Sequence, residues 1–165
     1  MKLLILGYTL SGKSTTAAIL AEILNTKYAD TSAKLIEEFA ASRGLTINYI
    51  RENKNQFRAD LFAFGRARQA IDPLWPQDVQ INDFDILTGL RNPNEIEAAR
   101  TANLYNPIIW IDRPGVTAGP TDKLCPSDAD VIVHNNGAIS DLRSKLEQLV
   151  REFRVTHPDM QSRLD

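Results

Sequence analysis

Residues 7–14 read GYTLSGKS, directly after a short apolar run and before a stretch of helix-forming residues. This segment matches the pattern G-x-x-x-x-G-K-[ST] in full, between an expected strand at 2–6 and an expected helix at 14–25. The two glycines let the backbone curl so that successive N–H groups point inward at an anion, and the helix adds the positive end of its dipole. The segment therefore predicts a loop that cradles a nucleoside triphosphate.

The side chains of this loop have predicted roles. Lys13 is expected to reach the β- and γ-phosphates, and the Ser14 hydroxyl to hold Mg²⁺, so ATP and Mg²⁺ are the implied cofactors. The residues of this segment that are predicted to bind the nucleotide are Gly7, Thr9, Leu10, Ser11, Gly12, Lys13, Ser14 and Thr15.

Short apolar runs recur along the chain, with helical patterns between them. The expected strands lie at 2–6, 27–29, 85–88, 107–111 and 131–133, and the expected helices at 14–25, 32–42, 53–71, 93–103 and 140–154. Runs without alternation of apolar and polar residues indicate strands buried on both faces. The pattern predicts an α/β fold, a three-layer sandwich with a five-stranded parallel sheet, whose ligands bind at the carboxyl ends of the strands.

Length and composition limit the organisation and the partners. The 165 residues fit one domain over 1–165, with a Gly- and Pro-rich lid loop at about 113–123 and a polar tail at about 155–165. A formal net charge of -2 means that any anion-binding surface is local. The single cysteine excludes an internal disulfide, and no apolar run approaches the ~20 residues that span a bilayer. We expect a cytoplasmic protein with no membrane partner.

Three classes of protein use such a loop, and two of them are disfavoured here. Guanine-reading switches usually carry N-K-x-D late in the chain, whereas the only Asn-Lys, at 53–54, is followed by Asn-Gln. Motor ATPases usually end a strand with an acid that coordinates Mg²⁺, whereas the strand in DILTG ends in Gly89. A small-molecule kinase is the best interpretation.

A kinase must also hold an acceptor opposite the γ-phosphate. Asp30 ends the second expected strand, where it can accept a proton from an acceptor hydroxyl or orient Mg²⁺. Capping of the next helix is its alternative role. Ser32 and Lys34 open that helix and are predicted to contact the acceptor.

The segment 53–71 is predicted to present a basic face to the acceptor. Steps of 100° per residue place four of its residues in one arc, Lys54, Arg58, Gly65 and Arg68. The opposite face, expected to pack, holds Ala63, Phe64, Ala67, Ala70 and Ile71. Arg66 falls outside the arc, and a solvated surface stripe is the alternative for the basic face.

Three later segments complete the predicted site. Arg91 follows the third strand, where a guanidinium can grip a phosphate through two parallel hydrogen bonds, and Glu95 is expected to serve the following helix or to pair with an arginine. Arg113, at the root of the lid loop, is predicted to contact the triphosphate, with a plain surface loop as the alternative. The turn HNNG at 134–137, with Asn136, can read an adenine edge, although Asn-Gly is also a common bare turn.

These motifs resemble those of the bacteriophage-type P-loop deoxynucleoside monophosphate kinases. GYTLSGKS resembles the P-loop of that family, YADTSAK its Y-A-D-P-L-K segment, DILTGLRNPNEIEAAR a strand that reads toward D-V-R followed by P-N-E, and IIWIDRP its fourth strand and lid root. The resemblance implies a nucleotide-kinase fold with a short lid, and a host cytoplasm if the protein is phage-encoded. It implies ATP at 7–15 and acceptor contacts near Asp30, Lys34, Arg58 and Arg91.

The expected reaction is the ATP- and Mg²⁺-dependent transfer of a γ-phosphoryl group to a deoxynucleoside monophosphate. Alternatives are a kinase of the hydroxymethyl group of 5-hydroxymethyluracil in phage DNA, a kinase of another small hydroxyl acceptor, and a non-catalytic nucleotide-binding module. An isoelectric point near 5.7 favours a small acceptor over long DNA, and a homodimer is left open. The predicted catalytic residues are Lys13, Asp30, Arg58, Arg91 and Arg113; the predicted metal ligands are Ser14 and Asp30.

Overall fold

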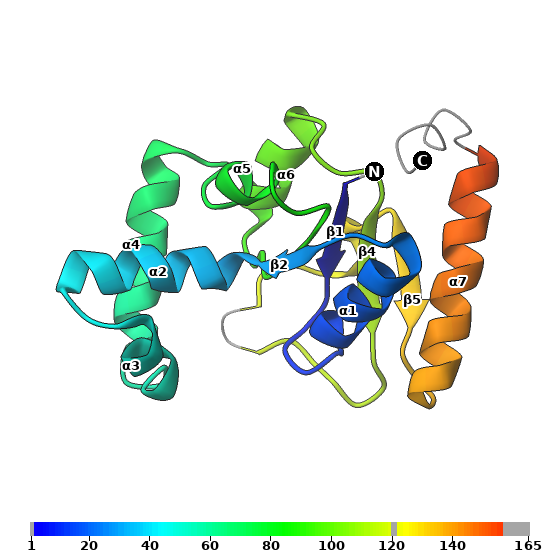
Figure 1. The fold of residues 1–165 in the computed structure, drawn as a ribbon, viewed down its shortest axis with the longest axis horizontal. Coiled ribbons are helices and arrows are strands. Elements are labelled where there is room, and N and C mark those ends of the chain that lie inside the picture. The colour runs from blue at the N-terminus through cyan, green and yellow to red at the C-terminus, as the bar shows by residue number, and fades with distance from the viewer. Residues whose placement is uncertain (1, 120–121, 157–165) are drawn as a thin grey trace.

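A five-stranded, entirely parallel sheet forms the centre of the structure, a computed structural model that describes residues 2–119 and 122–156 (Figure 1). The spatial order is β2-β3-β1-β4-β5, with β1 in the middle. Leu4 of β1 is in register with Leu87 of β3 on one side and with Ile108 of β4 on the other. The strands are β1 (Leu3–Leu6), β2 (Tyr28–Asp30), β3 (Ile86–Thr88), β4 (Ile108–Asp112) and β5 (Val131–His134).

Helices cover both faces of the sheet, and this confirms the predicted α/β three-layer architecture. The helices are α1 (Lys13–Leu24), α2 (Thr31–Arg43), α3 (Ile47–Glu52), α4 (Arg58–Ile71), α5 (Gln77–Gln80), α6 (Pro93–Thr101) and α7 (Ile139–Thr156), with a 3₁₀ turn η1 (Pro126–Asp128). Among these described helices, none has both the length and the apolar character needed to cross a bilayer.

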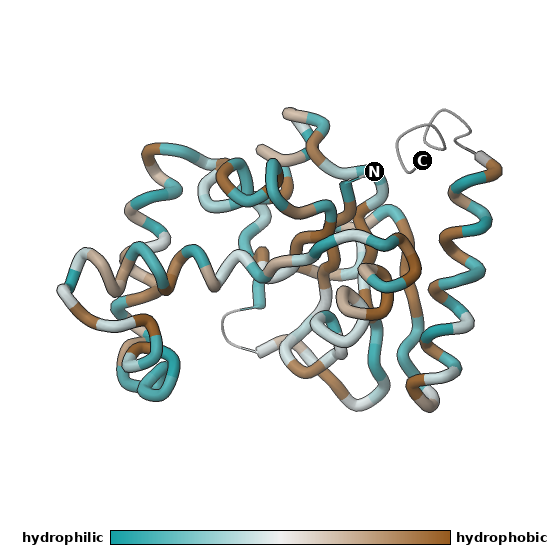
Figure 2. The backbone as a smooth tube through the Cα atoms, viewed as in Figure 1, coloured by the Kyte–Doolittle hydropathy of each residue, from teal (hydrophilic) through white to brown (hydrophobic). Residues whose placement is uncertain are grey.

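The strands read as continuous apolar runs because each face of the sheet has its own core. Leu3 and Ile5 pack with α1 and α7 on one face, whereas Leu4 and Leu6 pack with α6 on the other. Figure 2 shows the central strands as the most hydrophobic part of the backbone. The sheet is therefore anchored on both sides, and the loops at its carboxyl edge are held by rigid elements.

A third, smaller core joins α2, α3 and α4 beside the sheet edge formed by β2 (Figure 1). It consists of Ile36, Phe39, Ala40, Ile50 and Leu61, with Phe57 and Phe64 packed against it among others. The α2–α4 pair therefore stands apart from the sheet, which leaves room between these helices and the carboxyl ends of β2 and β3.

The expected continuous helix at 53–71 is wrong in two respects. The helix α4 begins only at Arg58, because α3 ends at Glu52 and residues 53–57 form turns, so Lys54 lies outside it. The packing face also differs in part: Phe64 packs as expected, but α4 docks on α2 through Leu61 and Gly65, and Ile71, expected to pack, is 84% exposed. The short helices α3 and α5 were not expected from the sequence.

Two expected surface segments fall partly outside the described residues. Of the lid loop at about 113–123, the structure describes 113–119 and 122–123, and of the tail at about 155–165 it describes the last residues of α7.

Candidate functional site

The phosphate loop joins β1 to α1 and has the backbone shape that the sequence predicts. Gly7, Leu10 and Gly12 have φ angles of 146°, 70° and 101°. A Cβ on Gly7 would lie 2.7 Å from the carbonyl oxygen of Ile111, so the strand β4 leaves no space for a side chain there. Gly12 caps α1 without a side-chain hydrogen bond, which leaves the first N–H groups of the helix open to an anion.

Lys13 lies folded over this loop. Its ammonium group donates hydrogen bonds to the carbonyl oxygens of Gly7, at 2.8 Å, and Tyr8, at 2.7 Å. Burial lowers the pKa of Lys13 and nearby Arg91 lowers it further, whereas Asp122 and Asp30 act in the opposite direction. These four charged groups therefore share one electrostatic environment at the carboxyl edge of β1.

The loop suits a Mg²⁺–triphosphate. Ser11 Oγ is buried beside Gly7 and has no hydrogen-bond partner among the described residues, and Ser14 is exposed in the first turn of α1. Within the described ranges, no group of three or more His, Cys, Asp or Glu side chains could hold a metal alone. Mg²⁺ that is bound mainly by phosphate and water oxygens, with one or two protein ligands, needs no such group.

Asp30 caps α2, which is the alternative role that the sequence left open for it. Its Oδ1 accepts the backbone N–H of Ser32 at 2.8 Å, and its Oδ2 accepts the hydroxyl of Thr88 at 3.2 Å. This carboxylate also explains the glycine that ends the strand in DILTG, because a Cβ on Gly89 would lie 2.6 Å from Asp30 Oδ1. A larger residue does not fit at position 89 while Asp30 holds this position.

A cavity of about 400 Å³ opens between the α2–α4 pair and the carboxyl end of β3. Its walls are largely apolar, and its polar lining includes three cationic side chains, Arg66, Arg91 and Lys123. The lining residues are Thr31, Ser32, Leu35, Leu61, Phe62, Gly65, Arg66, Gln69, Trp75, Pro76, Gly89, Arg91, Asn92, Glu95 and Lys123.

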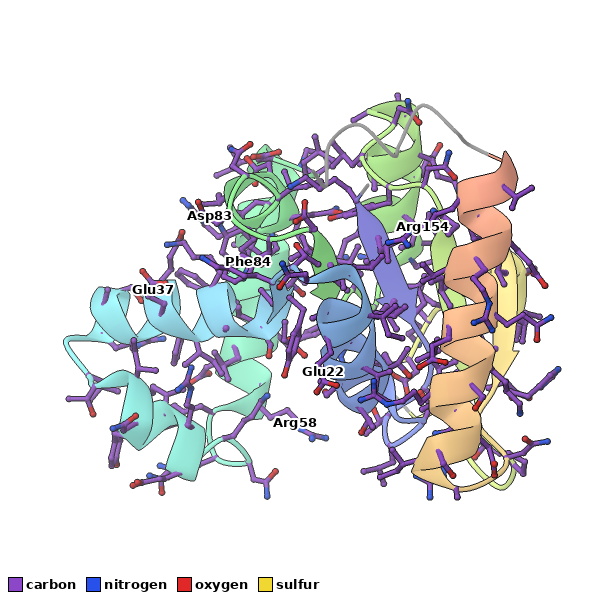
Figure 3. The ribbon with its side chains drawn as sticks, turned by 45° about the vertical axis from the view of Figure 1, so that its right-hand side comes forward. Glu22, Glu37, Arg58, Asp83, Phe84 and Arg154 are labelled. Atoms are coloured by element: carbon purple, nitrogen blue, oxygen red, sulfur yellow. The ribbon has the colours of Figure 1, made fainter. Side chains whose placement is uncertain are left out.

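Of the residues predicted to bind the acceptor, Ser32 and Arg91 line this cavity. The others do not, and two of them have acidic partners. Lys34 lies 3.1 Å from Glu37, and Arg68 lies 2.9 Å from Glu38. Figure 3 shows Arg58 at the beginning of α4 with its side chain extending away from the helix.

Arg66 lines the cavity although the helical arc placed it outside the acceptor face. Its guanidinium lies 6.0 Å from the centre of the Phe62 ring, which also lines the cavity. The arc included Lys54, which is not in the helix, whereas its member Gly65 both docks on α2 and lines the cavity. The spacing Phe62–Arg66, one helical turn on the same face, is the sequence signal that was available.

The segment after β4 approaches the phosphate loop through two residues. Arg113, which was predicted to contact the triphosphate, lies next to the loop, where Nη1 donates to the carbonyl oxygen of Leu10 at 3.3 Å. Asp122 was not predicted. Its carboxylate accepts hydrogen bonds from Arg91 Nη1 at 3.0 Å, from the backbone N–H of Gly119 at 3.0 Å and from that of Thr9 at 3.4 Å.

The HNNG turn, in which Asn136 was predicted to read an adenine edge, contacts the phosphate loop through Asn135. Asn135 Nδ2 donates to the carbonyl oxygen of Ser11 at 2.9 Å. Asn136 instead accepts a hydrogen bond from Lys145 Nζ at 2.7 Å. The sequence alone does not distinguish two adjacent asparagines, and Asn135 is the one that directly follows the register pair of Asp112 and His134 at the end of β5.

Glu95 serves α6, as expected, and is also part of the cavity. It forms a capping box with Asn92, in which its carboxylate accepts the Asn92 N–H at 2.8 Å. It also accepts the backbone N–H of Arg91 at 2.9 Å. The side chain is buried, and this burial raises the pKa of Glu95 even though the hydrogen bonds oppose the shift.

Comparison with known proteins places this arrangement in a fold class. No family model and no curated protein matches the sequence. Solved structures do match over almost the whole chain. A shikimate kinase from Aquifex aeolicus is 21% identical with a TM-score of 0.54 over 94% of this chain and 99% of its own. A shikimate kinase from Acinetobacter baumannii in complex with shikimate is 17% identical with a TM-score of 0.57, over 93% and 94%.

A third structure, described as a sugar kinase from Janibacter, is 15% identical with a TM-score of 0.51, over 91% of this chain and 94% of its own. At these levels of sequence identity, all three structures show a similarity of fold. The fold and the phosphate loop together define a P-loop protein with the architecture of small-molecule kinases.

Proposed function

We propose that the protein is an ATP- and Mg²⁺-dependent kinase that transfers the γ-phosphoryl group to a deoxynucleoside monophosphate. The observation that carries the proposal is the cavity beside the phosphate loop. Its volume of about 400 Å³ lies in the usual range for small-ligand sites, and its apolar walls suit a flat aromatic base. The names of the matched structures, shikimate kinase and sugar kinase, support a kinase in general.

The cationic groups of the cavity suit a phosphate acceptor. Arg91 lines the cavity and is bound to Asp122, whose carboxylate also contacts Thr9 of the phosphate loop. Arg91 therefore lies at the junction of the two compartments, where a phosphate of the acceptor would face the triphosphate. Arg66 and Lys123 add positive charge along the same cavity. A monophosphate is already ionised, so these clamps suffice to position it without a general base.

The environment of Asp30 favours this acceptor over an alcohol. A hydroxyl acceptor gains from a general base, for which Asp30 was the candidate. Both of its oxygens accept hydrogen bonds within the protein, from Ser32 and Thr88, and Asp30 does not line the cavity. We therefore assign Asp30 to the positioning of α2 and the β3 end.

In the proposed reaction, ATP supplies the phosphoryl group and the chain supplies position and positive charge. The open N–H groups of the loop and the α1 terminus hold the triphosphate, and Ser14 provides a metal ligand. Lys13 exchanges the carbonyl oxygens of Gly7 and Tyr8 for phosphate oxygens. Arg113 approaches the triphosphate from the segment after β4.

The test is a product assay with γ-labelled ATP and Mg²⁺. The acceptors are deoxynucleoside monophosphates, shikimate, simple sugars, and single- and double-stranded DNA that contains 5-hydroxymethyluracil, with a sample that has no acceptor. We expect label in a nucleoside diphosphate. Label that appears only in long DNA, or only on shikimate or a sugar, contradicts the nucleotide acceptor, and bound ATP with no product in any sample indicates a binding module.

A matched pair of variants ties the activity to the loop. Lys13→Ala is expected to abolish turnover with the fold retained, since among the described residues the hydrogen bonds of the Lys13 side chain go to carbonyl oxygens of its own loop. Lys27→Ala is the control, because Lys27 is exposed and precedes β2, so it lies at the amino ends of the strands, whereas the phosphate loop lies at their carboxyl ends. Equal rates for the two variants would remove Lys13 from the mechanism.

A further inference from the structure

One carboxylate bridges the phosphate loop and the acceptor cavity. Asp122 lies in the segment after β4, and its side chain is 6% exposed. Its Oδ1 atom accepts a hydrogen bond at 3.0 Å from Nη1 of Arg91, which lines the cavity. Its Oδ2 atom lies 3.4 Å from the backbone nitrogen of Thr9 and 3.5 Å from the Thr9 hydroxyl, and both of these groups donate to it. The carboxylate is therefore held by the loop on one side and by the cavity on the other.

The local backbone keeps this carboxylate in place. The backbone N–H of Gly119 donates to Asp122 Oδ2 at 3.0 Å, and the backbone N–H of Asp122 donates to the carbonyl oxygen of Gly119 at 3.0 Å. Arg91 Nη1 also donates to the Thr9 hydroxyl at 3.3 Å, which joins the three side chains in one cluster. A carboxylate that is withdrawn from water to this extent needs such donors.

The partners of Asp122 are groups that suit a phosphate. The N–H groups of a phosphate loop point at an anion, and an arginine binds phosphate oxygens through charged hydrogen bonds. Thr9 belongs to the loop proposed to hold ATP, and Arg91 to the cavity proposed to hold the acceptor. Asp122 therefore occupies groups on both sides of the place where a phosphoryl group would pass from one to the other.

We propose that the Asp122 carboxylate competes with phosphate for Thr9 and Arg91, so that it must leave both before ATP and the acceptor are held together. The inference rests on the proposed function, since it concerns the regulation of the same site. A second anion at these groups would be repelled by the carboxylate at short range. Release of Asp122 leaves Arg91 to the acceptor phosphate, so the binding of ATP prepares the acceptor side.

The test is the affinity for ATP with Mg²⁺, and for inorganic tripolyphosphate as a probe without a base, measured by calorimetry. Asp122→Asn keeps the shape of the side chain and removes its charge. This variant is expected to bind both ligands ~10- to 30-fold more tightly than wild type, since it removes hydrogen bonds to a charged group that compete with the ligand. In turnover, the KM for ATP and the KM for the monophosphate are expected to fall together, while kcat does not rise.

Two controls separate competition from a general change of charge. Burial is the main cause that lowers the pKa of Lys13, and Asp122 and Asp30 both act against this lowering. Asp30→Asn therefore removes a second negative charge from the surroundings of Lys13, keeps a residue that can cap α2, and leaves the contacts of Asp122 unchanged. It is expected to tighten ATP binding by at most about 3-fold. Asp83→Asn removes an exposed charge before β3, at the amino ends of the strands, and is expected to have no effect.

A second variant keeps the inference testable if Asp122→Asn does not fold. Asp122→Ser removes the carboxylate, but its hydroxyl can still accept the N–H of Gly119 within the same turn. It is expected to show the same gain in affinity for ATP and for tripolyphosphate. Urea unfolding of each variant without ligand verifies that the fold is retained.

The outcomes separate this inference from the proposal beneath it. A gain in affinity in the Asp122 variants that exceeds the gain in Asp30→Asn supports the inference. Unchanged or weaker ATP binding in the Asp122 variants overturns it, because Asp122 then only positions Arg91, and an equal gain in Asp30→Asn overturns it because charge alone then explains the effect. Loss of the fold in both Asp122 variants also overturns it. Failure of every monophosphate to accept label overturns the proposed acceptor, and the comparison of ATP affinities still decides the role of Asp122.

Discussion

Replacement of Gly7 by alanine is the sharpest test of the phosphate loop. A Cβ at this position would lie 2.5 Å from Ser11 Oγ and 2.7 Å from the carbonyl oxygen of Ile111. The serine hydroxyl can rotate away, but the carbonyl oxygen belongs to β4, which pairs with β1 along its length. The φ angle of 146° adds backbone strain, because side-chain-bearing residues rarely adopt it.

Gly44 provides a matched control for this variant. It caps α2 with a φ of 65°, and nothing lies within 4 Å of its added Cβ. Gly44→Ala should cost about 1 kcal/mol of left-handed strain. Gly7→Ala combines ~1–3 kcal/mol of strain with ~1–3 kcal/mol of overpacking, so about 2–6 kcal/mol is expected.

The assay is urea and thermal unfolding of both variants, with ATP binding by calorimetry. The cost for Gly7→Ala corresponds to a melting temperature lower by roughly 5–20 °C, against about 2–4 °C for Gly44→Ala. ATP affinity should fall only in the Gly7 variant. Equal losses of stability, together with unchanged ATP binding by Gly7→Ala, would refute the close approach of β4 to the loop.

Three further predictions concern groups around the loop and the cavity. Asn135→Ala, which removes the hydrogen bond to the Ser11 carbonyl oxygen, should weaken ATP binding measured by calorimetry more than Asn136→Ala does; the reverse order would return the nucleotide contact to Asn136. A double-mutant cycle of Arg91→Met and Asp122→Asn should give a coupling of ~1 kcal/mol in unfolding free energy that shrinks in high salt, and zero coupling would count against the ion pair. Burial raises the pKa of Glu95 above its ordinary 4.5, so this carboxyl stays protonated to a higher pH in the folded state than in the unfolded state. The protein therefore loses stability as pH rises through the raised pKa. The free energy of unfolding, measured at pH 4 and pH 7, should show Glu95→Gln gaining stability relative to wild type at the higher pH, and a gain at the lower pH would contradict this sign.

The sheet was predictable because burial on both faces leaves a mark in the sequence. Leu3 and Ile5 face one core and Leu4 and Leu6 the other, so the strand shows no polar position. Each expected strand lies within one residue of an observed one at either end. The glycine and lysine spacing of the phosphate loop was equally readable, because a backbone that turns at positive φ needs glycine at Gly7 and Gly12.

The cavity was harder to predict because its geometry depends on contacts between residues far apart in the sequence. The face by which α4 docks is decided by Leu35 of α2, which lies 3.4 Å from a Cβ added at Gly65. Nothing in 53–71 itself contains that information. The same holds for Gln69 and Glu95, which are 26 positions apart and are brought within hydrogen-bonding distance by the tertiary structure. The positions of charged residues around a helix therefore predict its exposed face less well than the surface on which the helix docks.

The order of the strands in the sheet places the cationic side chains around the phosphate loop. The central strand β1 delivers Lys13, and its neighbours β3 and β4 lead to Arg91 and Arg113, so cations flank the phosphate loop on both sides. The contacts of Asn135 with the loop come from beyond β5, whereas the cavity lies toward β2, α2 and α4. The phosphate loop with its Asn135 contact and the cavity thus lie toward different sides of the central strand at the carboxyl edge of the sheet. If the cavity holds the acceptor, as we propose, substitutions in α4 are expected to change the selectivity for the acceptor without touching the residues around the phosphate loop.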